Sequence, residues 1–134
     1  MDNKQRVSIK LESVSEEETT LQLAKGELYE RPGGWFLRYE EPDPDQGVVT
    51  STIKFTYNQI KLMRRGAVES DMSFEVGVTH QGFYTTPMIQ MTLETTTTEI
   101  LVELQEGKGR LRWSYYLLTQ NDSSSLRRVT VWIS

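Results

Sequence analysis

His80 carries the side chain best suited to acid–base chemistry in this sequence, because imidazole titrates near neutral pH. It is the one histidine of the chain, and it continues an apolar alternation that begins at Met72. At the end of such a row it could act as a general base or contact an anion at the mouth of a barrel. The competing interpretation is a half-buried histidine that ends a strand, and the lack of a partner motif nearby favours it.

Two adjacent arginines, Arg64 and Arg65, precede Gly66. Guanidinium groups form paired hydrogen bonds with carboxylates and phosphates, so the two could bind an anion. Paired arginines in a turn are usually solvated, however, and exposed ion pairs add little free energy. The sequence therefore favours solvation and leaves anion binding as the alternative.

Aromatic side chains are the third group with a chemical use. They could line a ligand cavity, but they also fill the interior of small barrels, which is the favoured interpretation. The residues concerned are Trp35, Tyr39, Tyr57, Tyr84, Trp113, Tyr115 and Trp132.

Patterns for catalysis and metal binding are otherwise absent from the sequence. With no cysteine and one histidine, the chain lacks a set of thiolate and imidazole ligands for a transition metal. It has no phosphate-binding loop, dinucleotide fingerprint or nucleophile elbow. Glu40 and Glu41 are not a catalytic pair, because consecutive residues of a strand face opposite sides. We therefore expect a protein that is not an enzyme and uses no cofactor or metal.

Length and composition indicate one ordinary domain spanning residues 1–134. The chain has 37% hydrophobic and 25% charged residues, near the average of globular domains. Its formal charge of -4 argues against nucleic acid as the main partner. Residues 1–30 contain no continuous apolar stretch, so we expect neither a signal peptide nor a membrane span, and a cytoplasmic location.

Apolar and polar residues alternate along nearly the whole chain, which is the pattern of half-buried β-strands. The row from Met72 to His80 shows this alternation most clearly, and turn residues such as Arg31-Pro32-Gly33-Gly34 separate the rows. Short strands joined by tight turns predict an all-β fold, a single closed antiparallel barrel of about eight strands, mostly up-and-down. We expect four long apolar rows to point into this barrel. They are led by Val7, Trp35, Phe74 and Trp113.

The strand registers follow from requiring the apolar faces of neighbouring strands to coincide. A two-residue turn at Gln81-Gly82 predicts Phe74 opposite Ile89. Apolar residues occupy odd-numbered positions before Gly26 and even-numbered positions after it, which suggests a bulge at that glycine.

The last three strands are expected to pair in the same way. A two-residue turn at Gly107-Lys108 predicts Val102 opposite Trp113, and it places Arg112 against Glu103 on the reverse face. A three-residue loop at 121–123 then predicts Trp113 opposite Val131.

Three segments in succession resemble the YwiB-like proteins, an uncharacterised bacterial family. They are Gly34-Trp35-Phe36-Leu37-Arg38-Tyr39-Glu40-Glu41, Met63-Arg64-Arg65-Gly66-Ala67-Val68 and Tyr84-Thr85-Thr86-Pro87. Their order, their spacing and the overall length are similar across nearly the whole chain. The resemblance implies a calycin-like, lipocalin-like β-barrel in a small intracellular protein, and it supplies no catalytic residue.

Two functions from different classes remain open. In the first, the barrel is not an enzyme and binds a small apolar or amphipathic ligand inside or at one mouth, near His80 and Tyr84. In the second, the barrel has a filled core and serves as a structural or protein-interaction domain, with a homodimer as one form. The candidate ligand-binding residues are Trp35, Arg38, Tyr39, Arg65, His80, Tyr84 and Tyr115.

Overall fold

The computed structural model describes residues 4–43, 47–120 and 124–134. These residues form ten β-strands. The strands are β1 (Lys4–Val14), β2 (Thr19–Arg31), β3 (Gly34–Asp43), β4 (Gly47–Phe55), β5 (Gln59–Gly66), β6 (Glu69–Glu75), β7 (Thr79–Thr85), β8 (Gln90–Gln105), β9 (Lys108–Thr119) and β10 (Ser125–Ile133).

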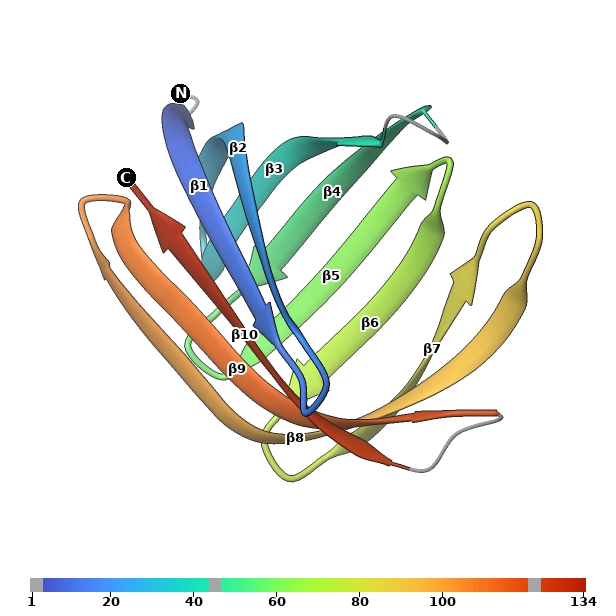
Figure 1. The fold of residues 1–134 in the computed structure, drawn as a ribbon. Coiled ribbons are helices and arrows are strands. Elements are labelled where there is room, and N and C mark those ends of the chain that lie inside the picture. The colour runs from blue at the N-terminus through green and yellow to red at the C-terminus, as the bar shows by residue number, and fades with distance from the viewer. Residues whose placement is uncertain (1–3, 44–46, 121–123) are drawn as a thin grey trace.

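Each strand pairs antiparallel with the next along the chain, and β1 pairs with β10 to close the barrel. Figure 1 shows this order as a continuous change of colour around the wall, with both chain ends on one side. The predicted closed up-and-down barrel is confirmed, with ten strands in place of about eight. We call the end where β1 begins and β10 finishes the terminal end, and the opposite end the far end.

The core lies inside the barrel and is formed by the rows that the sequence predicts. Val7, Phe74 and Trp113 are buried, and the apolar residues next to them on the inward face of the same strands are buried or partly buried. Trp35 is half-buried and stacks on Phe55, with ring centroids 5.3 Å apart. For these four rows the alternation of residue types therefore predicts correctly which side of the strand faces inward.

The predicted turn at Gln81-Gly82 is wrong, because both residues lie inside β7. The chain turns earlier, where the Val78 amide donates to the Glu75 carbonyl at 3.0 Å and Gly77 adopts a φ of +80°. This geometry is that of a tight turn with glycine at its third position. Apolar and polar residues alternate through this turn as they do in the strands, so the alternation alone does not reveal the turn.

Gly82 has a different role from the one predicted. A Cβ atom at this position would lie 2.1 Å from the carbonyl oxygen of Asp71 on β6. The glycine therefore allows two strands to approach closely. Asp71 is opposite Phe83, and Phe74 is not opposite Ile89.

The register of β8 against β9 differs from the predicted one by two residues. Val102 lies opposite Leu111, and Ile100 takes the predicted place opposite Trp113. The turn consists of Glu106 and Gly107, both with positive φ, as a two-residue hairpin turn of this type requires. A shift of two residues leaves every side chain on the same face of the sheet. The prediction of which residues are buried was therefore correct, although the predicted cross-strand partners were not.

The register of β9 against β10 is also two residues away from the prediction, and the predicted loop at 121–123 lies outside the described residues. Trp113 is opposite Val129 instead of Val131. Arg112 lies opposite Thr130 and donates to its hydroxyl at 3.2 Å, while the shift of β8 against β9 places it away from Glu103. Arg110 forms the ion pair with Glu103, at 2.7 Å.

Glu106 is the one non-glycine residue with positive φ in the described part of the chain, at 56°. We expect Glu106→Asn to raise the free energy of unfolding by about 0.5–1 kcal/mol, because asparagine tolerates the left-handed region better than glutamate. Urea unfolding followed by circular dichroism measures this change. Glu103→Asn, on the neighbouring strand and outside the turn, is the control and should give no gain. A loss of stability in Glu106→Asn would contradict the assigned turn.

Gly26 carries no bulge, because β1 and β2 pair without interruption from Val14 and Thr19 to Lys4 and Tyr29. The change from odd to even apolar positions has another cause, because Leu21 and Leu23 point outward and are exposed. At Gly26 a Cβ atom would lie 2.6 Å from a side-chain carbon of Ile9, so the position has no room for a larger residue.

β2 and β3 part at Gly26. Their ladder runs from Arg31 and Gly34 to Gly26 and Tyr39, and no described strand pairs with β2 between Thr19 and Lys25 on that side. Figure 1 shows the two strands diverging from the terminal end. The wall of the barrel is therefore split along part of its length. The described residues contain no helix of the length and hydropathy needed to cross a membrane.

Candidate functional site

The interior of the barrel is divided into two chemically different halves. Toward the terminal end it is packed with apolar side chains, such as Leu37, Phe55 and Leu111. Toward the far end, the inward-facing positions carry polar and charged groups as well. Since buried polar groups lower stability unless they are paired, their presence inside a barrel points to a function. We call this region the inner polar half.

One side of the inner polar half is a network of side chains from three neighbouring strands. Arg64 follows Ile60 and Leu62 on the inward face of β5, and its Nε donates to Glu41 Oε2 at 3.0 Å. The Ser51 hydroxyl donates to the same carboxylate oxygen. Glu41 thus neutralises Arg64 within the barrel.

Tyr39 adjoins this network and is buried at the base of the split in the wall. Burial raises the pKa of its phenol well above the ordinary value, and the nearby charge of Glu41 adds to the increase. The phenol therefore stays protonated and serves as a hydrogen-bonding group.

The opposite side of the inner polar half consists of Thr97, Tyr115 and Arg127, which are direct neighbours across β8, β9 and β10. Arg127 shares the face of the buried Val129, so it points inward. Its Nε atom is buried and has no hydrogen-bond partner among the described residues. The Thr97 hydroxyl is also buried and unpartnered, with Thr97 1% exposed.

Tyr115 lies between these two unpartnered groups. Burial raises the pKa of its phenol to about 12, although the charge of Arg127 lowers it. Its ring packs against Phe74 at 4.7 Å between centroids, which fixes it at the boundary of the apolar core.

Apolar side chains near the far end face inward but are only half-buried. Leu11, Leu62, Met72 and Leu117 pack against the core on one side without being fully covered. Solvent therefore reaches part of the inward-facing surface at this end of the barrel. The inner polar half therefore offers apolar surface beside charged groups.

Three of the predicted ligand-binding residues face this region. Tyr39 and Tyr115 are buried within it, and Tyr84 is half-buried opposite the inward-facing Ser70. They lie on β3, β9 and β7, so residues distant in sequence are assembled on one inner surface.

Two others lie on the outside of the barrel. Arg38 is exposed on β3. Arg65 is also exposed; it forms an ion pair with Asp71 at 2.8 Å and donates to the Ser70 carbonyl oxygen at 3.1 Å. The Asp71 carboxylate raises the pKa of Arg65. Arg65 thus has its own anion on the surface and does not face the interior.

Trp35 and His80 lie toward the terminal end. His80 Nε2 is 3.4 Å from Glu75 Oε1, beside a hollow of about 210 Å³. Ligand pockets usually exceed about 300 Å³, so this hollow is small for a site. His80 and Tyr84 stand at the second and sixth positions of β7 and do not share one mouth.

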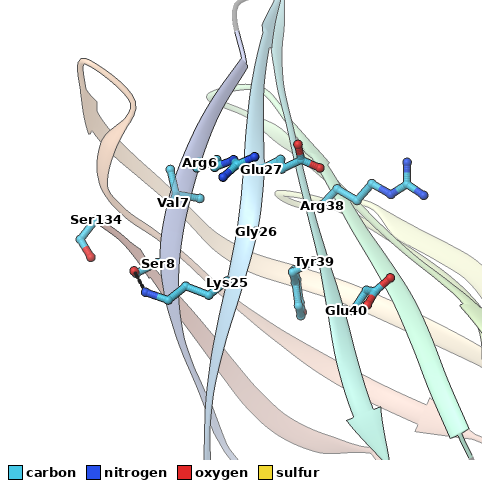
Figure 2. A pocket seen from close by; sticks show the side chains of 10 residues that line it. All are labelled: Arg6, Val7, Ser8, Lys25, Gly26, Glu27, Arg38, Tyr39, Glu40 and Ser134. Carbon is cyan, nitrogen blue, oxygen red and sulfur yellow. Dashed lines mark hydrogen bonds between the residues drawn. The ribbon is translucent and has the colours of Figure 1, made fainter.

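The split between β2 and β3 forms a second candidate, which we call the wall cleft. It comprises two adjoining hollows of about 820 and 630 Å³ that share Ser8, Lys25 and Glu40. Figure 2 shows the larger hollow, in which Lys25 reaches across to Ser8 and donates to its hydroxyl at 2.7 Å. Cations and carboxylates alternate along it, including Arg38 and Glu27, so it has no marked preference for an anion.

Metal binding has no support in the described part of the chain, where no three histidine, aspartate or glutamate side chains are grouped in a way that would hold an ion. The side chains present instead offer hydrogen bonds, one unpaired guanidinium and apolar contacts. The arrangement is suited to binding a molecule.

Sequence reasoning missed Arg127, and of the pair Arg64 and Arg65 it chose Arg65 as the candidate binding residue. The signal was present: Arg64 continues the row of Ile60 and Leu62, while Arg65 falls on the other face. In the same way Arg127 continues the row of Val129, and the adjacent arginine does not. Because alternate residues of a strand face opposite sides, the position of each arginine in its strand shows which member of the pair faces inward.

Comparisons with known proteins agree with the fold. Residues 6–131 match the family described as "Domain of unknown function (DUF1934)". The "Uncharacterized beta-barrel protein YwiB" of Bacillus subtilis (strain 168) is 27% identical over 106 residues, covering 79% of this chain and 74% of that protein. The crystal structure of the ywiB protein from Bacillus subtilis is similar with a TM-score of 0.78 and 22% identity, covering 98% of this chain and 93% of that one. The predicted resemblance to the YwiB-like family is confirmed.

Proposed function

The chain belongs to the DUF1934 family, and from the geometry of its barrel we propose that it binds a small amphipathic ligand carrying one anionic group. The ligand occupies the inner polar half and is bound without being chemically changed. Arg127 contacts the anionic group, and the half-buried apolar side chains cover the rest of the molecule.

Arg127 is the observation that carries this proposal. Its guanidinium points into the barrel, its Nε is buried without a partner, and no described carboxylate lies within ion-pair distance. A charge in such a place costs free energy unless an opposite charge accompanies it. A carboxylate, phosphate or sulfonate group on a ligand would supply that charge and could accept a hydrogen bond from the Thr97 hydroxyl.

The charge balance of the inner polar half supports a single anionic group. Arg64 is neutralised by Glu41, which leaves Arg127 as the net positive charge among the described inward-facing side chains of this half. A ligand with one negative charge restores neutrality, whereas a second charge would have no partner. Electrostatics therefore selects for charge number as well as sign.

Two fluorescent dyes with the same ring skeleton test the proposal. 8-Anilinonaphthalene-1-sulfonate has one sulfonate, and N-phenyl-1-naphthylamine is neutral. We expect Arg127→Gln to raise the Kd of the anionic dye by about tenfold, because a charge-assisted hydrogen bond contributes about 1.5–3 kcal/mol. The Kd of the neutral dye should change less than twofold. Fluorescence titration gives both constants, and the anionic dye should also raise Tm.

Arg128→Gln is the matched control, since Arg128 is the next residue of β10 but faces outward and donates to the Ser114 hydroxyl at 3.1 Å. This variant should bind both dyes as the unmodified protein does. The proposal is wrong if the anionic dye fails to bind the unmodified protein at a saturable site, or if both arginine variants affect it equally.

A further inference from the structure

The unpaired edge of β2 has the properties of an interface between two copies of this chain. The Ser8 amide and carbonyl both bond to Ser134 beside β10. Neighbouring residues of a strand direct their backbone groups to opposite sides, so Ile9 and Leu11 bond to β2 at Ala24 and Gln22. The backbone groups of the odd-numbered residues of β2 therefore point away from β1.

Between Thr19 and Lys25 these outward-directed groups find no strand among the described residues. The segment thus offers the N–H and C=O groups of Leu21 and Leu23 to another chain. Natural sheets usually protect such an edge with charged residues, proline or a bulge. Here the middle of the edge carries two leucines that are 58% and 73% exposed.

We propose that a second copy of the chain binds at this edge, with its own β2 antiparallel and a two-fold axis passing through Gln22. In this register Leu21 of one copy lies opposite Leu23 of the other, twice, and Thr19 lies opposite Lys25. Leu21 and Leu23 both present their backbone groups to the partner, so the same pair of hydrogen bonds forms on each side of the axis. The same surface is used by both copies, as a two-fold interface requires.

The surroundings of the edge are complementary to the leucines of a second copy. Leu23 and the exposed Val48 line the same hollow of about 630 Å³ in the wall cleft, so an added strand places apolar side chains against both. Lys25 lies at one end of the segment and the acidic run Glu16 to Glu18 precedes the other. Antiparallel pairing brings these opposite charges near each other.

Leu23→Lys tests the interface by adding a charge at its centre. We expect the unmodified protein to be dimeric and Leu23→Lys to be monomeric at the same concentration, by light scattering coupled to size exclusion. Leu118→Lys is the control, because Leu118 is exposed on the outward face of β9. It should remain dimeric. An unmodified protein that is monomeric at all concentrations, or a Leu23→Lys variant that stays dimeric, would overturn the proposal.

The register has its own test, because the chain contains no cysteine. In Gln22→Cys the two sulfur atoms meet across the two-fold axis at a separation that suits a disulfide. Mild oxidation should convert most of the protein to a covalent dimer, whereas Leu118→Cys should remain largely monomeric on a denaturing gel. Equal crosslinking of the two variants would refute the register. Neither experiment involves Arg127 or a ligand, so the outcome is independent of the proposed function.

Discussion

Truncation of Trp113 to alanine should lower the free energy of unfolding by about 3–5 kcal/mol, the range for removal of a large aromatic side chain from a core. Trp113 is 1% exposed, and its ring lies 5.5 Å from that of Phe74 between centroids. Since small domains are stable by only about 5–15 kcal/mol, this loss would unfold a large fraction of the molecules on modest heating. Urea unfolding followed by far-ultraviolet circular dichroism measures it.

Trp113→Phe separates the loss of packing from the loss of polar contacts. The indole Nε1 is buried without a hydrogen-bond partner among the described residues, and phenylalanine removes that unpaired donor. We expect Trp113→Phe to cost less than about 1.5 kcal/mol, because relief of the donor offsets part of the lost volume. If the two variants were equally unstable, the indole N–H would have a partner and the ring would be held by it.

Alkaline pH should destabilise the barrel steeply. The pKa of Tyr115 is about 12 in the folded protein and 10.0 for an ordinary tyrosine. Between these values the unfolded chain loses the proton while the folded chain keeps it, so stability is complete below pH 10 and declines as pH rises toward 12. Two pKa units correspond to about 2–3 kcal/mol at the end of this interval. The raised pKa of Tyr39 adds to the loss.

Stability measured by urea unfolding at several pH values between 9 and 12 tests this expectation. Tyr115→Phe removes the titrating group, so its stability should decline less than that of the unmodified protein. Tyr57→Phe is the control, because Tyr57 is exposed, and it should show the full decline. A Tyr115→Phe variant with an unchanged pH profile would show that the phenol ionises as readily in the folded state as in the unfolded state.

The sequence was sufficient for the fold because a side-chain period of two determines which face of a strand is buried. Val7, Phe74 and Trp113 were placed inside correctly on this ground. Registers are less constrained, since a slip of two residues preserves both faces. Turn chemistry decided between them: Gly77 and Gly107 have the positive φ of true turns, whereas Gly82 is placed by the carbonyl of Asp71.

The site was harder to predict, because its residues lie on separate strands. Tyr39 and Tyr115 belong to the rows that alternation places inside, whereas Tyr84 was expected at a mouth of the barrel beside His80. Arg127 was missed because a charged residue at an inward position contradicts the usual rule for cores. Its importance depends on the absence of a nearby carboxylate, which only the arrangement of β8, β9 and β10 shows.

The closure of the barrel between β1 and β10 has a consequence for biosynthesis. The two strands that meet at this seam are the first and the last of the ten to be made. Until residues 125–133 have left the ribosome, β1 and β9 both carry open edges, and the sheet is a curved ribbon that neighbouring nascent chains could extend. Contacts of such long sequence separation also form slowly. Speed of translation and access to chaperones during this interval therefore influence how much of the protein reaches the closed state.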